Sequence, residues 1–400
     1  MKRQIFFSLV VLIFLALGTI AVILYGKGYQ FGFGNGRPQV TGTGLLVATS
    51  TPDGAQVLVD GHLTTATNNT INLQPGTYDI QIVKDGYFPW EKKLTVEKEV
   101  VTKAAALLFP KAPKLESITD SGVENPVIDP SHTKLAFVVA SQSAAQNGVY
   151  ILNLQDQSLL TLQSGATQIA DETTGIPFSQ ANLMWSPDGQ SILATIPGVS
   201  GNTTYLLTTT GANPNPQDIT ETLTTVQQEW NTQLSQKSQS EIAGLAPKLK
   251  QFVKNNWDIL AWSPDDTKIL YEASTSATLP QIITPPLIGT NSIPENRTLQ
   301  PHAVYVYDTK EDKNYLLVGK DKTFGTDYKL TWFPDSEHLI YVHDKKIDIM
   351  EYDATNDTTI YAGPFIDGDV FPWNDGSKVV MLTDFSNPNT QPNLYTIDLQ

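Results

Sequence analysis

A repeated turn constrains this 400-residue chain more than any other feature. Three segments carry a Trp, a Pro-Asp turn and then an apolar run, at residues 184–193, 261–271 and 331–341. Two degenerate copies stand at residues 128–137 and 371–380. In such turns Pro presets the backbone, and Asp and Gly tolerate a tight conformation. Because a second β-run follows each copy, the pattern predicts the blades of a β-propeller.

The spacing of these turns predicts the number of blades. A blade needs about 40–45 residues, and the wide intervals between Pro187 and Pro264 and between Pro264 and Pro334 must contain insertions. We predict five blades over residues 113–400, with six or an irregular number as the alternatives. The final strand, near residues 394–399, leaves the last blade one strand short. Residues 114–119 form a predicted outermost strand that can complete it.

The first wide interval predicts a helical insertion over residues 217–256. Apolar residues recur there at helical spacing, and Pro247 is typical of the start of a second helix. Trp230, Leu234 and Phe252 are candidates for a partner surface, because insertions on propellers commonly build one. The alternative is that the helices cover one face of the ring. The second wide interval holds a Pro- and Thr-rich loop at residues 274–300.

In these repeats the chain resembles the WD-like repeats of TolB-type β-propellers, over residues 113–400. The resemblance implies the fold but says little about function, because propellers support binding, scaffolding and catalysis alike.

Residues 45–108 predict a small antiparallel β-sandwich, because short alternating apolar runs end at turns at intervals of about 8–12 residues. Four ordered landmarks stand in this segment: Pro52-Asp53-Gly54-Ala55, Val57-Leu58-Val59-Asp60-Gly61, Leu73-Gln74-Pro75-Gly76 and Asp85-Gly86-Tyr87. In these landmarks the segment resembles the PEGA domain family. The resemblance implies an exported, non-catalytic domain similar to carbohydrate-binding β-sandwiches.

Three aromatic residues near the end of this segment, Tyr87, Phe88 and Trp90, are candidates for stacking on a sugar or peptide. The alternative is that they pack at the edge of the sandwich or against the next domain, since aromatic side chains usually bury large areas.

The N-terminal residues 5–25 form an uncharged apolar run that is long enough to span a bilayer. We predict an uncleaved signal anchor, with residues 1–4 as a cytoplasmic tail because Lys2 and Arg3 precede the run. A cleaved signal peptide and a buried helix of a soluble protein are the alternatives. The Gly-rich residues 26–44 are predicted as a linker. The expected location is therefore the cell membrane, crossed once, with the bulk of the chain extracytoplasmic.

The composition excludes several kinds of chemistry. With no cysteine, the chain has no disulfide, thiolate metal site or thiol nucleophile. The net charge of −15 argues against a nucleic-acid partner. Residues 353–357 and 367–369 gather oxygen ligands for a calcium ion, but neither continues as an EF-hand loop. No motif for catalysis or for a cofactor stands in the sequence.

We therefore expect a non-enzymatic, membrane-anchored binding or scaffold protein that uses both modules for protein–protein or envelope-glycan interaction. The order of anchor, PEGA domain and propeller resembles that of membrane-anchored bacterial envelope proteins. Two alternatives remain: an extracellular sensor with a separate signalling partner, and an envelope polysaccharide lyase or hydrolase. Carboxylates or a His converging in the propeller channel would favour the enzyme, whereas an apolar or Lys-capped channel would oppose it.

Overall fold

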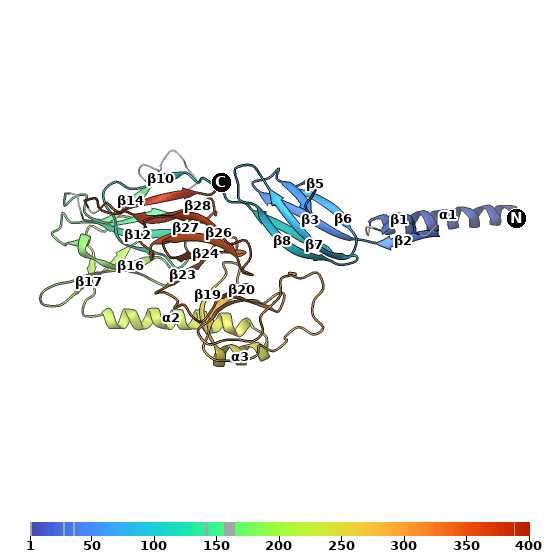
Figure 1. Cartoon of the computed structure of the whole chain (residues 1–400). Coiled ribbons are helices and arrows are strands. Elements are labelled where there is room, and N and C mark those ends of the chain that lie inside the picture. The colour runs from blue at the N-terminus through green and yellow to red at the C-terminus, as the bar shows by residue number, and fades with distance from the viewer. Residues whose placement is uncertain (1, 27–28, 35–36, 141–142, 156–164, 388) are drawn as a thin grey trace. The chain divides into compact units, whose positions relative to one another are not determined.

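The computed structural model describes residues 2–26, 29–34, 37–140, 143–155, 165–387 and 389–400 (Figure 1). The fold is mainly β, with 42% strand and 15% helix, as the sequence predicts. The chain divides into two compact units. Unit 1 comprises Met1–Leu108 with Ile283–Glu295, and unit 2 comprises Phe109–Ile282 with Asn296–Gln400.

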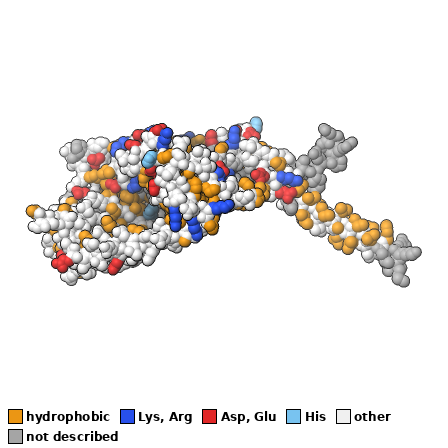
Figure 2. Space-filling model, turned by 90° about the horizontal axis from the view of Figure 1, so that it is seen from below, with side chains coloured by type: hydrophobic (Ala, Val, Ile, Leu, Met, Phe, Trp, Pro, Cys, Tyr) orange, Lys and Arg blue, Asp and Glu red, His pale blue; other side chains and the backbone are white. Residues whose placement is uncertain are grey.

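The N-terminal part of unit 1 is the helix α1 (Lys2–Gly26). Its segment Phe6–Leu24 has a mean hydropathy of 2.9 and is long and apolar enough to cross a membrane. Hydrophobic side chains are visible along this helix in Figure 2. Within the predicted linker the chain forms a hairpin of β1 (Tyr29–Gly34) and β2 (Arg37–Gly42). Met1 of the predicted tail and residues 27–28 and 35–36 of the predicted linker lie outside the described residues.

The rest of unit 1 is built on a two-sheet sandwich. One sheet has the order β6 (Asn69–Leu73), β3 (Gly44–Thr51), β9 (Val101–Leu107). The other has the order β5 (His62–Ala66), β4 (Gln56–Val59), β7 (Gly76–Val83), β8 (Trp90–Val96). Alternate side chains of both sheets, such as Leu46, Val57 and Ile80, are fully buried between them, because successive strand residues point to opposite faces.

One strand pairing corrects the expectation of an entirely antiparallel sandwich. Strands β3 and β9 run parallel, with Leu45 opposite Val101. The reason is that β8 and β9 belong to different sheets. The turn between them therefore crosses from one sheet to the other, and β9 enters the first sheet in the direction of β3.

Part of the long loop predicted at residues 274–300 also belongs to unit 1. The Thr95 backbone N–H donates a hydrogen bond to the Ser292 hydroxyl over 2.8 Å. At Gly289, where φ is +69°, an added Cβ would stand 2.5 Å from a methyl carbon of Val100. Both the left-handed backbone and the close approach therefore require glycine.

Within the described part of unit 2, twenty strands form five four-stranded sheets. The first sheet is β11 (Glu124–Ile128), β12 (Lys134–Val139), β13 (Gly148–Asn153), β14 (Ala166–Asp171). The second is β15 (Asn182–Trp185), β16 (Ser191–Ile196), β17 (Thr203–Thr208), β18 (Gln217–Asp218). The third is β19 (Trp257–Trp262), β20 (Lys268–Ala273), β21 (Val304–Asp308), β22 (Lys313–Val318).

The fourth sheet is β23 (Tyr328–Trp332), β24 (His338–His343), β25 (Lys346–Glu351), β26 (Thr358–Ala362). The fifth has the order β27 (Val370–Pro372), β28 (Lys378–Thr383), β29 (Asn393–Asp398), β10 (Leu115–Ser117). Each repeated turn joins the first two strands of one sheet, so the sequence repeats correspond to the sheets of a propeller.

The residues of the repeated turn stabilise it directly. In the second sheet the Ser186 hydroxyl donates to Asp188 over 2.6 Å and accepts from the Ser191 N–H over 2.9 Å. The preceding residue, Trp185, donates its indole N–H to the Val127 carbonyl in the first sheet over 2.9 Å. The repeat thus fixes both the turn and the contact between neighbouring sheets.

The two ends of unit 2 meet in the fifth sheet. Strand β10 pairs antiparallel with β29, with Leu115 opposite Ile397, which confirms the predicted outermost strand. Beside the pairing, Thr119 donates its hydroxyl to the Asn393 side chain over 3.0 Å and accepts the Leu394 N–H over 2.9 Å. The closing strand thus comes from the opposite end of the domain.

The insertion after the second sheet forms the helices α2 (Leu223–Gly244) and α3 (Pro247–Asn256), and Pro247 begins the second helix as predicted. Helix α3 buries Leu249 and Val253 against the core of the third sheet. None of the residues of α2, all of which the structure describes, is fully buried. A short 3-10 helix, Phe178–Gln180, precedes β15.

We predict that Thr119→Val weakens the closure of unit 2. The change keeps the side-chain volume but removes both hydroxyl hydrogen bonds to the last strand, so the free energy of unfolding should fall by about 1–2 kcal/mol. Urea denaturation of the full chain in detergent measures this. The exposed Thr210→Val is the matched control. Equal midpoints for the two variants would contradict the role of Thr119.

Candidate functional site

A cavity of about 860 Å³ lies in unit 2 between helix α2 and the turns of the repeats. Residues of the first, third, fourth and fifth sheets line it, mainly from the innermost strands and the turns that follow them. We call it the axial cavity, because the innermost strands of a propeller surround its axis. In the view of Figure 2, unit 2 is hollowed, and hydrophobic side chains show in the hollow.

Helix α2 lies along one side of this cavity and covers a second one. The second cavity, of about 410 Å³, lies between Trp230 and Leu234 on the helix and turn residues such as Pro130 and Pro187. Leu234 lines both cavities and remains 50% exposed. The third predicted residue, Phe252, packs edge-on against Trp257, with ring centres 6.2 Å apart. The predicted partner surface is thus divided between α2 and the core of the third sheet.

Aromatic side chains form much of the wall of the axial cavity. Trp262 is half-buried, whereas Trp332 and Phe371 are 3% and 4% exposed. The buried indole N–H of Trp332 has no hydrogen-bond partner among the described residues. A buried donor without a partner is costly to the stability of the fold.

The basic residues of the cavity are Lys329, His132 and Lys237. Lys329 donates from Nζ to the Gly368 carbonyl over 2.7 Å, and Nζ lies 5.7 Å from the centre of the Phe371 ring. Burial lowers the pKa of Lys329. Burial also lowers the pKa of His132, and the positive charges of Lys329 and Lys237 add to the effect.

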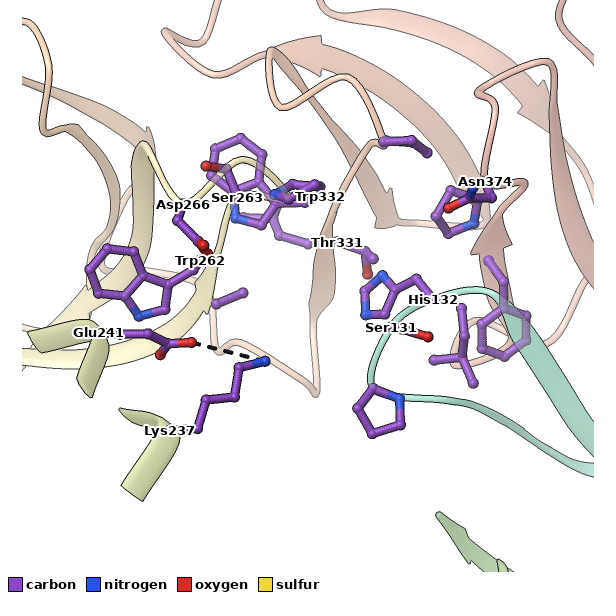
Figure 3. Close-up of a pocket in the computed structure, with 18 of the residues that line it drawn as sticks. Ser131, His132, Lys237, Glu241, Trp262, Ser263, Asp266, Thr331, Trp332 and Asn374 are labelled. Carbon is purple, nitrogen blue, oxygen red and sulfur yellow. Dashed lines mark ion pairs between the residues drawn. The ribbon is translucent and has the colours of Figure 1, made fainter. Parts of the chain in front are cut away.

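The acidic residues lie at one side of the cavity. On α2, Lys237 Nζ and Glu241 Oε1 form an ion pair at 3.9 Å (Figure 3). Burial raises the pKa of Glu241, and the negative charge of Asp266 adds to this. Figure 3 places Trp262, Asp266 and Glu241 on one side of the view, and His132 on the other.

The titratable residues of the cavity are one histidine, two lysines and two carboxylates. Burial is the main cause that lowers the pKa of the His132 ring, and the nearby Asp129 carboxylate opposes it. The Glu241 carboxylate forms an ion pair with Lys237. The cavity thus contains a His with carboxylates, which would favour an enzyme, and also a Lys, which would oppose one.

The aromatic candidates of the PEGA-like segment lie at the sandwich core. Trp90 is 3% exposed within that core, and Tyr87 packs against it as a partly buried residue. Phe88 is half-buried. Their binding to a sugar or peptide stays a prediction, and only Tyr87 and Phe88 expose part of their side chains beyond a few per cent.

At the two candidate calcium sites, residues 353–357 and 367–369, some carboxylate oxygen atoms already interact with other side chains. Asp353 accepts the Thr355 hydroxyl over 2.5 Å, and Asp367 pairs with Lys345 Nζ over 2.9 Å. No group of three or more His, Asp or Glu among the described residues could hold a metal ion.

The comparisons with known proteins agree with this architecture. Residues 43–111 match the family model described as PEGA domain, which confirms the predicted domain. No curated protein matches the chain. The chain thus combines a PEGA domain with a β-propeller. The propeller is defined by the set of five sheets with its closing strand.

Among solved structures, TolB from Acinetobacter baumannii is 13% identical with a TM-score of 0.22, over 81% of this chain and 60% of that one. Oligogalacturonate lyase from Vibrio parahaemolyticus is 10% identical with a TM-score of 0.28, over 72% and 93%. The β-propeller domain of the Trilobed protease from Pyrococcus furiosus is 12% identical with a TM-score of 0.20, over 69% and 68%. At these identities and TM-scores the likeness supports no conclusion about this chain.

Sequence reasoning missed His132 and Lys329 as site residues. His132 follows the turn proline of the most degenerate repeat, and Lys329 stands on a strand between apolar residues. Neither position has a spacing or a motif that distinguishes it from an ordinary surface residue. The repeated Trp before the turn was the available signal, since it places Trp262 and Trp332 at the cavity wall.

We predict a pH dependence of stability from Asp369. Burial raises its pKa to about 6, above the usual value for Asp of about 3.9 in an unfolded chain. A raised pKa contributes stability that is complete below pH ~3.9 and is lost as the pH rises through about 6. Asp369→Asn should therefore lose less stability than the wild type between pH 4 and pH 8, by urea denaturation at each pH. An unchanged difference between the two proteins across this range would contradict the assignment. Asp375→Asn, at an exposed turn, is the control.

Proposed function

We propose that the protein is a membrane-anchored binding protein whose propeller receives a segment of a partner protein in the axial cavity. The observation that carries the proposal is the cavity itself, about 860 Å³ in volume and lined by four of the five sheets and by α2. Ligand sites in proteins are typically concave, largely apolar and furnished with a few polar groups. This cavity has tryptophan and proline walls, and Lys329 is one of its polar groups.

A protein segment fits these walls better than a glycan does. The aromatic rings of Trp332 and Phe371 are almost fully buried, so neither offers an open ring face on which a sugar could stack. A peptide supplies apolar side chains that can pack on the prolines and on the half-buried Trp262 of the wall. The experiment below also shows whether the ligand is a glycan instead.

The experiment uses the full chain in nanodiscs of zwitterionic lipid. Random dodecapeptides displayed on phage are selected on it, and enriched peptides are synthesised and measured by fluorescence anisotropy. Ser238→Trp places a bulky side chain on α2 at the cavity wall, whereas Ser240→Trp makes the same change on the same helix outside the residues that line it. We expect at least a tenfold loss of affinity for the first variant and none for the second.

Two results would contradict the proposal. Peptides that bind Ser238→Trp as well as wild type would place binding elsewhere on the protein. If no peptide is enriched while an immobilised glycan array is bound, and Ser238→Trp weakens that binding, the ligand of the cavity is a sugar.

The proposed topology is a single span of α1 with the rest of the chain outside the cytoplasm. The apolar helix supports it, because Phe6–Leu24 meets the length and composition that a membrane span needs. Since the chain has no cysteine, one introduced thiol reports its side of the membrane. We predict that a membrane-impermeant maleimide labels Thr210→Cys in intact cells, and labels Gln4→Cys only after permeabilisation. The reverse pattern would overturn the orientation.

A further inference from the structure

The ammonium group of Lys329 is in an unusual position for an acidic protein. It lies in the wall of the axial cavity, half-buried, and its hydrogen bond is to a backbone carbonyl, that of Gly368. No carboxylate of a described residue lies within 4 Å of Nζ, although Asp369 is near enough to interact electrostatically. A partly buried charge without a counter-ion is costly unless something else supplies one.

The neighbours of Lys329 do not supply that counter-ion. His132 and Lys237 are basic, and both line the same cavity. Glu241 is already engaged with Lys237. Asp266 is an exposed turn residue at the cavity, where solvent screens its charge. Asp369 is the carboxylate that acts on Lys329 electrostatically, but it forms no ion pair with Nζ within 4 Å, so the ammonium can still pair with a carboxylate supplied from outside.

We infer that the axial cavity selects an acidic peptide segment, one Asp or Glu carboxylate of which pairs with Lys329. The inference rests on the proposed function and names the ligand class of the same cavity. The carboxylate supplies the close ion-pair partner that Lys329 lacks among the described residues. His132 lines the wall beside this anion site as a second donor.

The test uses the peptides selected on the full chain in nanodiscs. Each enriched peptide that contains Asp or Glu is synthesised in parallel with its Asn or Gln counterpart, which differs in charge but hardly in shape. Both are measured on the wild type, on Lys329→Met and on Lys329→Arg. Lys320→Met is the matched control, because Lys320 is exposed, lies outside the cavity and changes the net charge equally.

The wild type should prefer the acidic peptide by about tenfold to a hundredfold, the range of a hydrogen bond between charged groups. The preference should disappear in Lys329→Met, persist in Lys320→Met and return at least in part in Lys329→Arg. A urea midpoint for each variant shows whether it is folded. If Lys329→Met unfolds, the preference for the acidic peptide is compared between Lys329→Arg and Lys329→Gln instead.

The outcomes separate the two proposals. Peptides that lose binding in Ser238→Trp but show no preference for Asp or Glu would overturn this inference and leave the proposed function standing. An acidic preference that survives in Lys329→Met would overturn it as well, since the charge would then act elsewhere. Binding that is insensitive to Ser238→Trp would overturn both.

Discussion

The pairing of β10 with β29 holds unit 2 together, and the cavity depends on it. Strand β10 comes from the beginning of the domain and β29 from its end, so this pairing completes the fifth sheet with a strand that directly precedes the first sheet in the chain. The two sheets also share one apolar cluster, in which Leu135 and Phe137 of the first contact Phe371 and Leu382 of the fifth. Without β10, the edge of β29 would be left unpaired, and unpaired edges invite other chains. Because residues from both sheets line the axial cavity, its shape is set by a contact between the two ends of the domain.

A second constraint holds the long insertion of the third sheet. The Asp312 side chain is almost fully buried and accepts hydrogen bonds from the Tyr307 hydroxyl over 2.9 Å and the Ile282 N–H over 2.7 Å. It also pairs with Arg297 Nη2 at 3.1 Å. Ile282 and Arg297 stand on either side of the segment 283–295, so one carboxylate fixes both points where that segment leaves and rejoins unit 2. A buried charge is tolerated when several donors satisfy it, and the surrounding sheet therefore does not depend on the conformation of the loop beyond these points.

The parts of the structure that follow from local chemistry could be predicted from the sequence. The Ser-Pro-Asp turns, the start of α3 at Pro247 and the closing strand near Leu115 each depend on a few neighbouring residues or on one missing strand. The parallel pairing of β3 with β9 could not, because it depends on which sheet the chain enters after β8.

The site could be predicted only in part. Trp185, Trp262 and Trp332 occupy the same place in the repeat, yet the latter two line the axial cavity and Trp185 lines the smaller one. That difference arises from the path of α2, which no periodicity in the sequence determines.

The path of α2 also explains why the axial cavity stays open. The helix buries none of its own residues, and the chain on either side of it is fixed by Ile219, which is 3% exposed, and by Leu245 and Leu249, which are 8% and 2% exposed. Its stability in the fold thus comes from its ends. Along its length, Leu234 remains half-exposed, and Lys237 pairs with Glu241 of the same helix. A helix held by packed ends does not need to fill the space beneath it, and the indole of Trp332 and the ammonium of Lys329 therefore remain at the wall of an 860 Å³ space.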